Sequence, residues 1–134
     1  MTNMETAVLF GNSLDKDDFA TTRRVLADDC CYIIGDEKLI GPTAISSSYE
    51  NNMIEGRKKL DELEWGQSRI EEINENEFYV HFTDYLTHKG IKYVHRCKQK
   101  LTLDANSKIV RIEHIDDPLE QERLNDYYKR VGLK

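Results

Sequence analysis

The run from Ile91 to Leu103 places hydrogen-bonding side chains on an otherwise apolar surface. Successive side chains of a β-strand point to opposite faces, so His95, Cys97 and Gln99 share one face with apolar residues. A buried face has no need of a histidine or a glutamine unless a partner satisfies their polar atoms. The other face carries four cations, Lys92, Arg96, Lys98 and Lys100. The pattern predicts a pocket on the first face and solvent on the second.

Two neighbouring runs also carry acid and base groups. Asp84 follows alternating apolar residues from Phe78 onward, and His114 ends a similar run. An aspartate beside a histidine orients the imidazole and favours its protonated form, which allows proton transfer near neutral pH. Asp84, His95 and His114 are therefore the predicted acid–base group. Each also has a structural alternative, namely solvation at a strand end for Asp84 and His95 and a backbone hydrogen bond for His114.

No pattern in the chain indicates a cofactor. The three acid–base candidates lack the local ligand spacing of a metal site. There is no glycine-rich phosphate loop and no G-x-S-x-G turn. Cys30, Cys31 and Cys97 form no C-x-x-C pair. We expect reduced thiols and neither a metal nor a cofactor, with a packing role for Cys97 rather than a nucleophilic one.

Length and charge narrow the class of protein. A chain of 134 residues has single-domain length and buries about two-thirds of its unfolded surface. A net charge of −6 and a pI near 5.2 argue against nucleic-acid binding. No apolar window reaches the length of a membrane span, and the first ten residues carry Glu5 without the basic flank of a secretory signal. We expect one domain over residues 1–134, located in the cytoplasm and binding neither nucleic acid nor membranes.

The first half of the chain supplies helices and a short hairpin. Thr2 and Glu5 form a capping-box pattern, and Gly41-Pro42 opens another helix because proline is tolerated in the first turn. Helices are expected near 3–13, 16–27 and 42–58, and strands near 30–34 and 38–40.

The second half supplies the main sheet and a closing helix. One strand is expected over 60–73 with a bulge near Gly66, followed by strands beginning at Phe78 and Ile91 and a last strand over 109–116. Asp117-Pro118 starts a C-terminal helix. Its apolar side carries Leu124, Tyr127, Tyr128 and Val131. We expect this side to cover the pocket or to pack against a partner subunit.

This order of elements resembles the nuclear transport factor 2-like superfamily, and especially its SnoaL-like polyketide-cyclase and ketosteroid-isomerase branches. The segments that carry the resemblance are 25–30 (VLADDC), 39–45 (LIGPTAI) and 107–114 (SKIVRIEH). They are similar to the family's "ADD" helix end, its "G-x-x-A-I" helix start and its "GKIV" final strand. The resemblance covers nearly the whole chain. It implies an α+β, cystatin-like cone in which a curved mixed or antiparallel sheet wraps around N-terminal helices and encloses a deep cavity.

The catalytic groups of the isomerase branch are missing at the matching positions. Its carboxylate base corresponds to Ile34, its oxyanion-binding tyrosine to Phe10, and its second oxyanion donor to Gln99. Isoleucine and phenylalanine transfer no proton. The chain is therefore not expected to be a standard ketosteroid isomerase.

The resemblance places the face of Gln99 inside the cavity and leaves two functional hypotheses. The implied ligand-binding residues are Tyr32, Phe82, Tyr93, Cys97, Gln99 and Ile112. In the first hypothesis the protein is a cofactor-independent lyase or isomerase that acts on a hydrophobic, oxygenated substrate. There His114 or His95 moves the proton, Asp84 orients or shares it, and Gln99 or Tyr93 binds a substrate oxygen. In the second it is a noncatalytic domain for ligand binding or assembly. The expected partner is a small hydrophobic or amphipathic molecule, and the relatives imply a homodimer.

Overall fold

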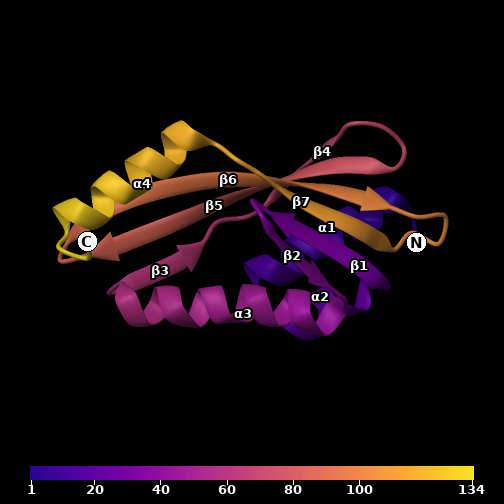
Figure 1. Ribbon diagram of the computed structural model, residues 1–134, viewed down its shortest axis with the longest axis horizontal. Coiled ribbons are helices and arrows are strands. Elements are labelled where there is room, and N and C mark those ends of the chain that lie inside the picture. Colours follow the sequence, from indigo (N-terminus) through magenta and orange to yellow (C-terminus); the bar gives the residue numbers. More distant parts are fainter.

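A computed structural model describes all 134 residues as a curved sheet with four helices (Figure 1). The strands are β1 (Leu26–Ile34), β2 (Glu37–Ile40), β3 (Glu62–Trp65), β4 (Arg69–Glu72), β5 (Glu77–His88), β6 (Ile91–Leu103) and β7 (Ile109–Ile115). The helices are α1 (Asn3–Asp15), α2 (Phe19–Arg24), α3 (Pro42–Lys59) and α4 (Pro118–Arg130). The strand order is β2-β1-β7-β6-β5-β3, and β4 also pairs with β5. Because β1 and β7 are parallel and all other pairs antiparallel, the sheet is mixed, and the predicted α+β class is confirmed.

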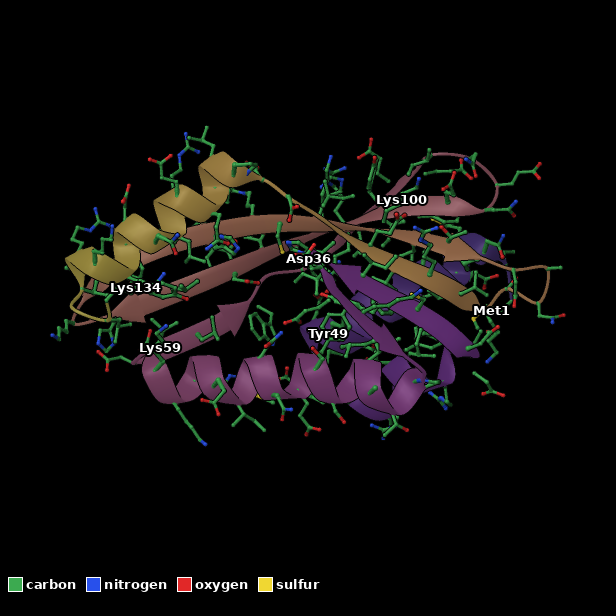
Figure 2. The ribbon with its side chains drawn as sticks, in the orientation of Figure 1. Met1, Asp36, Tyr49, Lys59, Lys100 and Lys134 are labelled. Atoms are coloured by element: carbon green, nitrogen blue, oxygen red, sulfur yellow. The ribbon has the colours of Figure 1, made fainter.

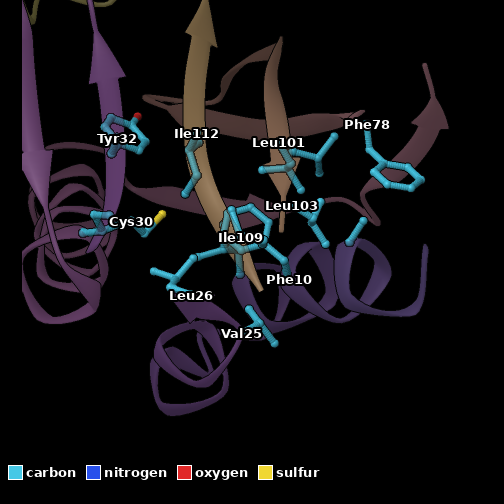
Figure 3. Close-up of a cluster of buried hydrophobic side chains, with 14 residues drawn as sticks. Phe10, Val25, Leu26, Cys30, Tyr32, Phe78, Leu101, Leu103, Ile109 and Ile112 are labelled. Carbon is cyan, nitrogen blue, oxygen red and sulfur yellow. The ribbon is translucent and has the colours of Figure 1, made fainter. Parts of the chain in front are cut away.

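The main core lies between the sheet and the N-terminal helices. Phe10 of α1 is fully buried and lies among strand side chains that include Leu103 and Ile109 (Figure 3). The predicted capping box holds the start of α1, since the Glu5 N–H donates to the Thr2 hydroxyl at 3.1 Å and the Thr2 N–H donates to the Glu5 carboxylate at 2.9 Å. Each such buried apolar side chain stabilises the fold by roughly 1.5–3 kcal/mol.

The predicted division of β6 into two faces is confirmed. Gln99 is only 4% exposed and Leu101 is fully buried, whereas Lys92 and Arg96 on the opposite face are exposed. The β5–β6 hairpin fixes this register with a two-residue turn, in which Lys89 and Gly90 both have positive φ. Such turns match the right-handed twist of the strands they join.

Two predicted elements are wrong in their extent. The second helix is only α2, because Val25 ends it and β1 begins at Leu26, which pairs with Ile109 of β7. The strand expected over 60–73 is two strands, β3 and β4, separated at Gly66. The Gly66 N–H donates to the Thr83 carbonyl at 2.8 Å, and a Cβ there would lie 2.9 Å from the Tyr85 ring. This close approach of the backbone to β5 requires the glycine.

The C-terminal helix packs against the sheet of its own chain. Tyr127 and Val131 are buried with Leu86 in a second apolar cluster, and the Tyr127 hydroxyl donates to the Ile91 carbonyl at 2.6 Å. Figure 1 shows α4 along the halves of β5 and β6 that extend beyond β7. The helix thus covers part of an otherwise open strand edge, which would be prone to pairing with other chains. No helix of the chain has the length and apolar character needed to span a membrane.

Candidate functional site

A cavity of about 210 Å³ lies between the sheet and helices α1 to α3. Strands β1, β5, β6 and β7 form its floor, and the helices and Trp65 of β3 form its walls. Five aromatic rings line it, those of Phe19, Tyr32, Tyr49, Trp65 and Phe82. Its ionisable lining groups include three carboxylates, and no lysine or arginine lines it.

A chain of hydrogen bonds crosses the cavity floor through Gln99. The Tyr49 hydroxyl donates to Gln99 Oε1 at 2.6 Å, and Gln99 Nε2 donates to the Tyr32 hydroxyl at 3.1 Å. Tyr49 extends from α3 toward the sheet (Figure 2), and its ring meets the Tyr32 ring edge-on with centroids 5.5 Å apart. These contacts satisfy the amide of Gln99, whose burial would otherwise be costly.

One tyrosine proton in this chain has no acceptor in the protein. With the amide as placed, the Tyr32 hydroxyl accepts from Gln99 and its own proton remains free. If the Gln99 amide were turned by 180°, the Tyr32 hydroxyl would donate to the amide oxygen and the amide nitrogen would donate to the Tyr49 hydroxyl. The proton of Tyr49 would then be the free one. Burial raises the pKa of Tyr32 to about 12 and that of Tyr49 well above its usual range. Both hydroxyls therefore stay neutral, and one of them can donate to a ligand oxygen.

Asp84 is the ionisable group with the most unusual surroundings. Its side chain lines the cavity and makes neither a hydrogen bond nor a salt bridge. Burial, with the neighbouring Asp15 carboxylate as the second cause, raises the pKa of Asp84 to about 7. A carboxyl group with this pKa exists in both protonation states near neutral pH, as a general acid or base requires.

The other two carboxylates of the cavity are held by neighbouring residues. Asp15 Oδ2 accepts hydrogen bonds from the Ser68 N–H and hydroxyl, both at 2.8 Å. Asp17 accepts from Trp65 Nε1 at 2.8 Å and pairs with Arg57 at 2.8 Å. Only Asp17 therefore has a cation beside it.

His114 lines the cavity beside Gln99, which is its pairing partner on β6. Its Nδ1 is buried and has no hydrogen-bond partner. Burial lowers the pKa of His114, and nearby His95 adds to this effect while Asp116 opposes it. The imidazole is therefore favoured in its neutral form, which can accept a proton.

His95 and Tyr93 lie outside the cavity lining, although His95 is the cross-strand partner of Asp84. His95 Nδ1 is 3.1 Å from Glu120 of α4, and the Tyr93 hydroxyl donates to the same oxygen at 2.5 Å. Burial opposes the ionisation of Glu120, but hydrogen bonds from Tyr93, the Arg96 N–H and His95 together lower its pKa. The structure thus joins His95 to Glu120 rather than to Asp84.

The remaining predicted site residues divide between cavity and core. Tyr32, Phe82, Cys97 and Gln99 line the cavity, while Ile112 is fully buried in the core and does not line it. Burial raises the pKa of the Cys97 thiol to about 12, so a reactive thiolate is disfavoured. No three His, Cys, Asp or Glu side chains converge as a metal site.

Sequence reasoning missed Tyr49, Asp15, Asp17 and Trp65 as cavity residues. Tyr49 lies in the stripe Ile45–Tyr49–Met53, whose four-residue spacing places these side chains on one face of a helix. Because a buried amide needs hydrogen-bond partners, a polar side chain such as that of Tyr49 could have been expected opposite Gln99. The residues at the end of α1 carried no comparable signal, because a turn rich in aspartate is usually solvated.

Several solved structures of low sequence identity share this fold. TerC, crystallised with polyporic acid, has a TM-score of 0.69 and 15% identity, covering 92% of this chain and 98% of its own. A nuclear transport factor 2-like protein of unknown function from Burkholderia pseudomallei has a TM-score of 0.68 and 17% identity, covering 91% and 95%. An LEH-like epoxide hydrolase from Mycobacterium tuberculosis has a TM-score of 0.65 and 16% identity, covering 98% and 96%.

No family model matches the sequence, and no curated protein is similar to it in sequence. The structural similarity nevertheless extends over almost the entire chain in each case. The protein therefore has the nuclear transport factor 2-like fold that its sequence resembles. At these identities the similarity establishes the fold, and the function must be argued from the cavity itself.

Proposed function

We propose that the protein binds a small, hydrophobic, oxygenated molecule in this cavity and transfers a proton on it without a cofactor, as a lyase or isomerase does. The observation that carries the proposal is the carboxyl group of Asp84, which lines an aromatic cavity without a partner. The free tyrosine proton beside Gln99 lies in the lining of the same cavity. A proton-transfer group and a donor for a substrate oxygen are the two parts that such chemistry needs.

In the proposed step, ionised Asp84 takes a proton from the carbon next to a substrate carbonyl. The electrons of the broken C–H bond form a C=C bond, and the carbonyl oxygen becomes an enolate oxygen. The free hydroxyl of Tyr32 or Tyr49 donates a hydrogen bond to that oxygen. Return of the proton from Asp84 to another carbon completes an isomerisation, and loss of a leaving group instead gives a lyase reaction. Neutral His114, which lines the floor of the same cavity, is a second site for the proton.

A noncatalytic ligand-binding role is the second candidate, and one observation favours it. Neither predicted histidine hydrogen-bonds to Asp84, because His95 is bound to Glu120 and His114 Nδ1 has no partner. In this alternative the Tyr32 and Asp84 groups select a ligand without transforming it. The two candidates share the ligand site and differ only in turnover.

Exchange of hydrogen for deuterium separates the two candidates without knowledge of the natural substrate. The probe is 2-tetralone, a hydrophobic ketone with acidic C–H bonds, followed in D2O by proton NMR. We expect the protein to accelerate exchange and Asp84→Asn to abolish the acceleration while 2-tetralone still changes the fluorescence of Trp65, the only tryptophan. Asp36→Asn, an exposed change in the β1–β2 turn, is the matched control. Binding without faster exchange would refute catalysis and favour the second candidate.

The homodimer expected from the relatives is also a proposal. It is supported by an apolar pair on the outer face of the sheet, where cross-strand partners Tyr85 and Val94 are 49% and 37% exposed. Sedimentation velocity of the protein and of Val94→Glu tests it. A dimer that the substitution dissociates supports this surface, and a monomeric unaltered protein rules the dimer out.

A further inference from the structure

The charges around the cavity carry information about the ligand, and the inference drawn from them rests on the proposed ligand-binding function. Of its three carboxylates, only Asp17 has a cationic partner, Arg57 at 2.8 Å. Asp15 is held by the uncharged N–H and hydroxyl of Ser68, and Asp84 has no partner. No lysine or arginine lines the cavity. Asp15 and Asp84 therefore line the same cavity without a counter-charge, and the Asp15 carboxylate is near enough to help raise the pKa of Asp84.

The uncharged part of the lining suits an organic cation better than a metal ion. Five aromatic rings surround the cavity, and the negative face of an aromatic ring attracts ammonium groups. A metal ion would need more oxygen or nitrogen ligands, and no three ligand-type side chains converge. An alkylammonium group needs only a carboxylate and contact with rings.

A separate observation indicates that the cavity is built for a ligand. Tyr32 is only 5% exposed, and both it and Tyr49 line the cavity. Because the single Gln99 amide accepts from one of these hydroxyls and donates to the other, one of the two hydroxyl protons has no acceptor in the protein. A buried donor without a partner is costly. A ligand with an oxygen acceptor would satisfy this donor, which comes from a different element of the lining than Asp15 of α1.

We propose that the natural ligand carries a positively charged nitrogen, held by Asp84 and Asp15 among the aromatic rings, together with a neutral oxygen that accepts from the tyrosine. Such a cation would offset the repulsion between the two carboxylates. It would also keep Asp84 ionised, which is the form that accepts a proton. An anionic ligand would add a third uncompensated negative charge and be excluded.

Three probes of the same shape and different charge test the proposal. They are 4-phenylbutylammonium, 4-phenylbutanol and 4-phenylbutyrate, each titrated at pH 7.5 and 150 mM salt by calorimetry and by Trp65 fluorescence. We expect the ammonium to bind at least tenfold more tightly than the alcohol, and the carboxylate most weakly. Asp84→Asn and Asp15→Asn should each reduce the preference for the ammonium to less than threefold while binding of the alcohol is retained. Asp36→Asn alters the net charge equally and should leave the preference unchanged.

The possible failures are distinguishable. If the alcohol binds but the carboxylate binds as tightly as the ammonium, or if the preference survives in both cavity variants, the cationic ligand is overturned and the ligand-binding cavity stands. If none of the three probes binds but 2-tetralone does, the cationic ligand is overturned and the ligand-binding cavity stands. If 2-tetralone does not bind either, both proposals are overturned.

Discussion

Replacement of Asp84 by asparagine should stabilise the protein, and more so as the pH rises. The pKa of this carboxyl group is about 7 in the folded protein against an ordinary value of 3.8. Each pKa unit corresponds to about 1.36 kcal/mol, so ionised Asp84 costs the fold roughly 4 kcal/mol, which is an upper bound. Asparagine has a similar shape and cannot ionise, so this cost disappears in the variant.

The pH window follows from the protonation of the two states. Between pH 3.8 and about 7 the folded protein binds more protons at Asp84 than the unfolded chain, so its free energy of unfolding falls as the pH rises. Below this window both states are protonated and the penalty is absent. Above it the whole penalty is present. The advantage of Asp84→Asn should therefore be close to zero near pH 4 and reach roughly 2–4 kcal/mol at pH 8.5.

Urea unfolding followed by Trp65 fluorescence measures this difference at pH 4, 6, 7 and 8.5, with Asp36→Asn as an exposed control. The slope of unfolding free energy against urea should be the same for all three proteins, since the surface exposed on unfolding is unchanged. An advantage that is absent at pH 8.5, or constant from pH 4 to 8.5, would mean that Asp84 is well hydrated. The reasoning about its buried carboxyl would then be refuted.

Two further stability predictions concern the tyrosine–glutamine chain and α4. Gln99→Leu leaves the buried hydroxyls of Tyr32 and Tyr49 without partners. It should lower the free energy of unfolding, measured by urea titration, by roughly 1–3 kcal/mol. An unchanged urea midpoint of unfolding would show that water replaces the amide. Deletion of residues 118–134 removes the buried side chains of Tyr127 and Val131. It should lower the free energy of unfolding by roughly 3–6 kcal/mol, which a lower melting temperature would reveal. Equal melting temperatures would show that α4 is dispensable.

Side-chain alternation predicted most of the sheet because it depends only on local geometry. The apolar and basic faces of β6 and the Asp117-Pro118 helix start are set by neighbouring residues. The extents of α2 and of the 60–73 segment depended on distant contacts. Leu26 pairs with Ile109, and Gly66 bonds to Thr83.

The candidate site was less predictable, because alternation gives the face of a residue and not its position along the strand. Ile112 and His114 share a face of β7, yet Ile112 is buried in the core and His114 lines the cavity. His95 faces its partner Asp84 across β5 and β6, but Glu120 binds it from a helix 25 residues further along the chain. Tertiary packing decides whether His95 bonds to Asp84 or to Glu120.

A crystal structure of the protein with 2-tetralone tests the central claim most directly. We expect the ketone in the cavity, with its oxygen roughly 2.6–3.2 Å from the hydroxyl of Tyr32 or Tyr49 and the adjacent carbon facing the Asp84 carboxylate. A ketone bound elsewhere, or bound here with its oxygen turned away from both tyrosines, would refute the proposed proton transfer by Asp84.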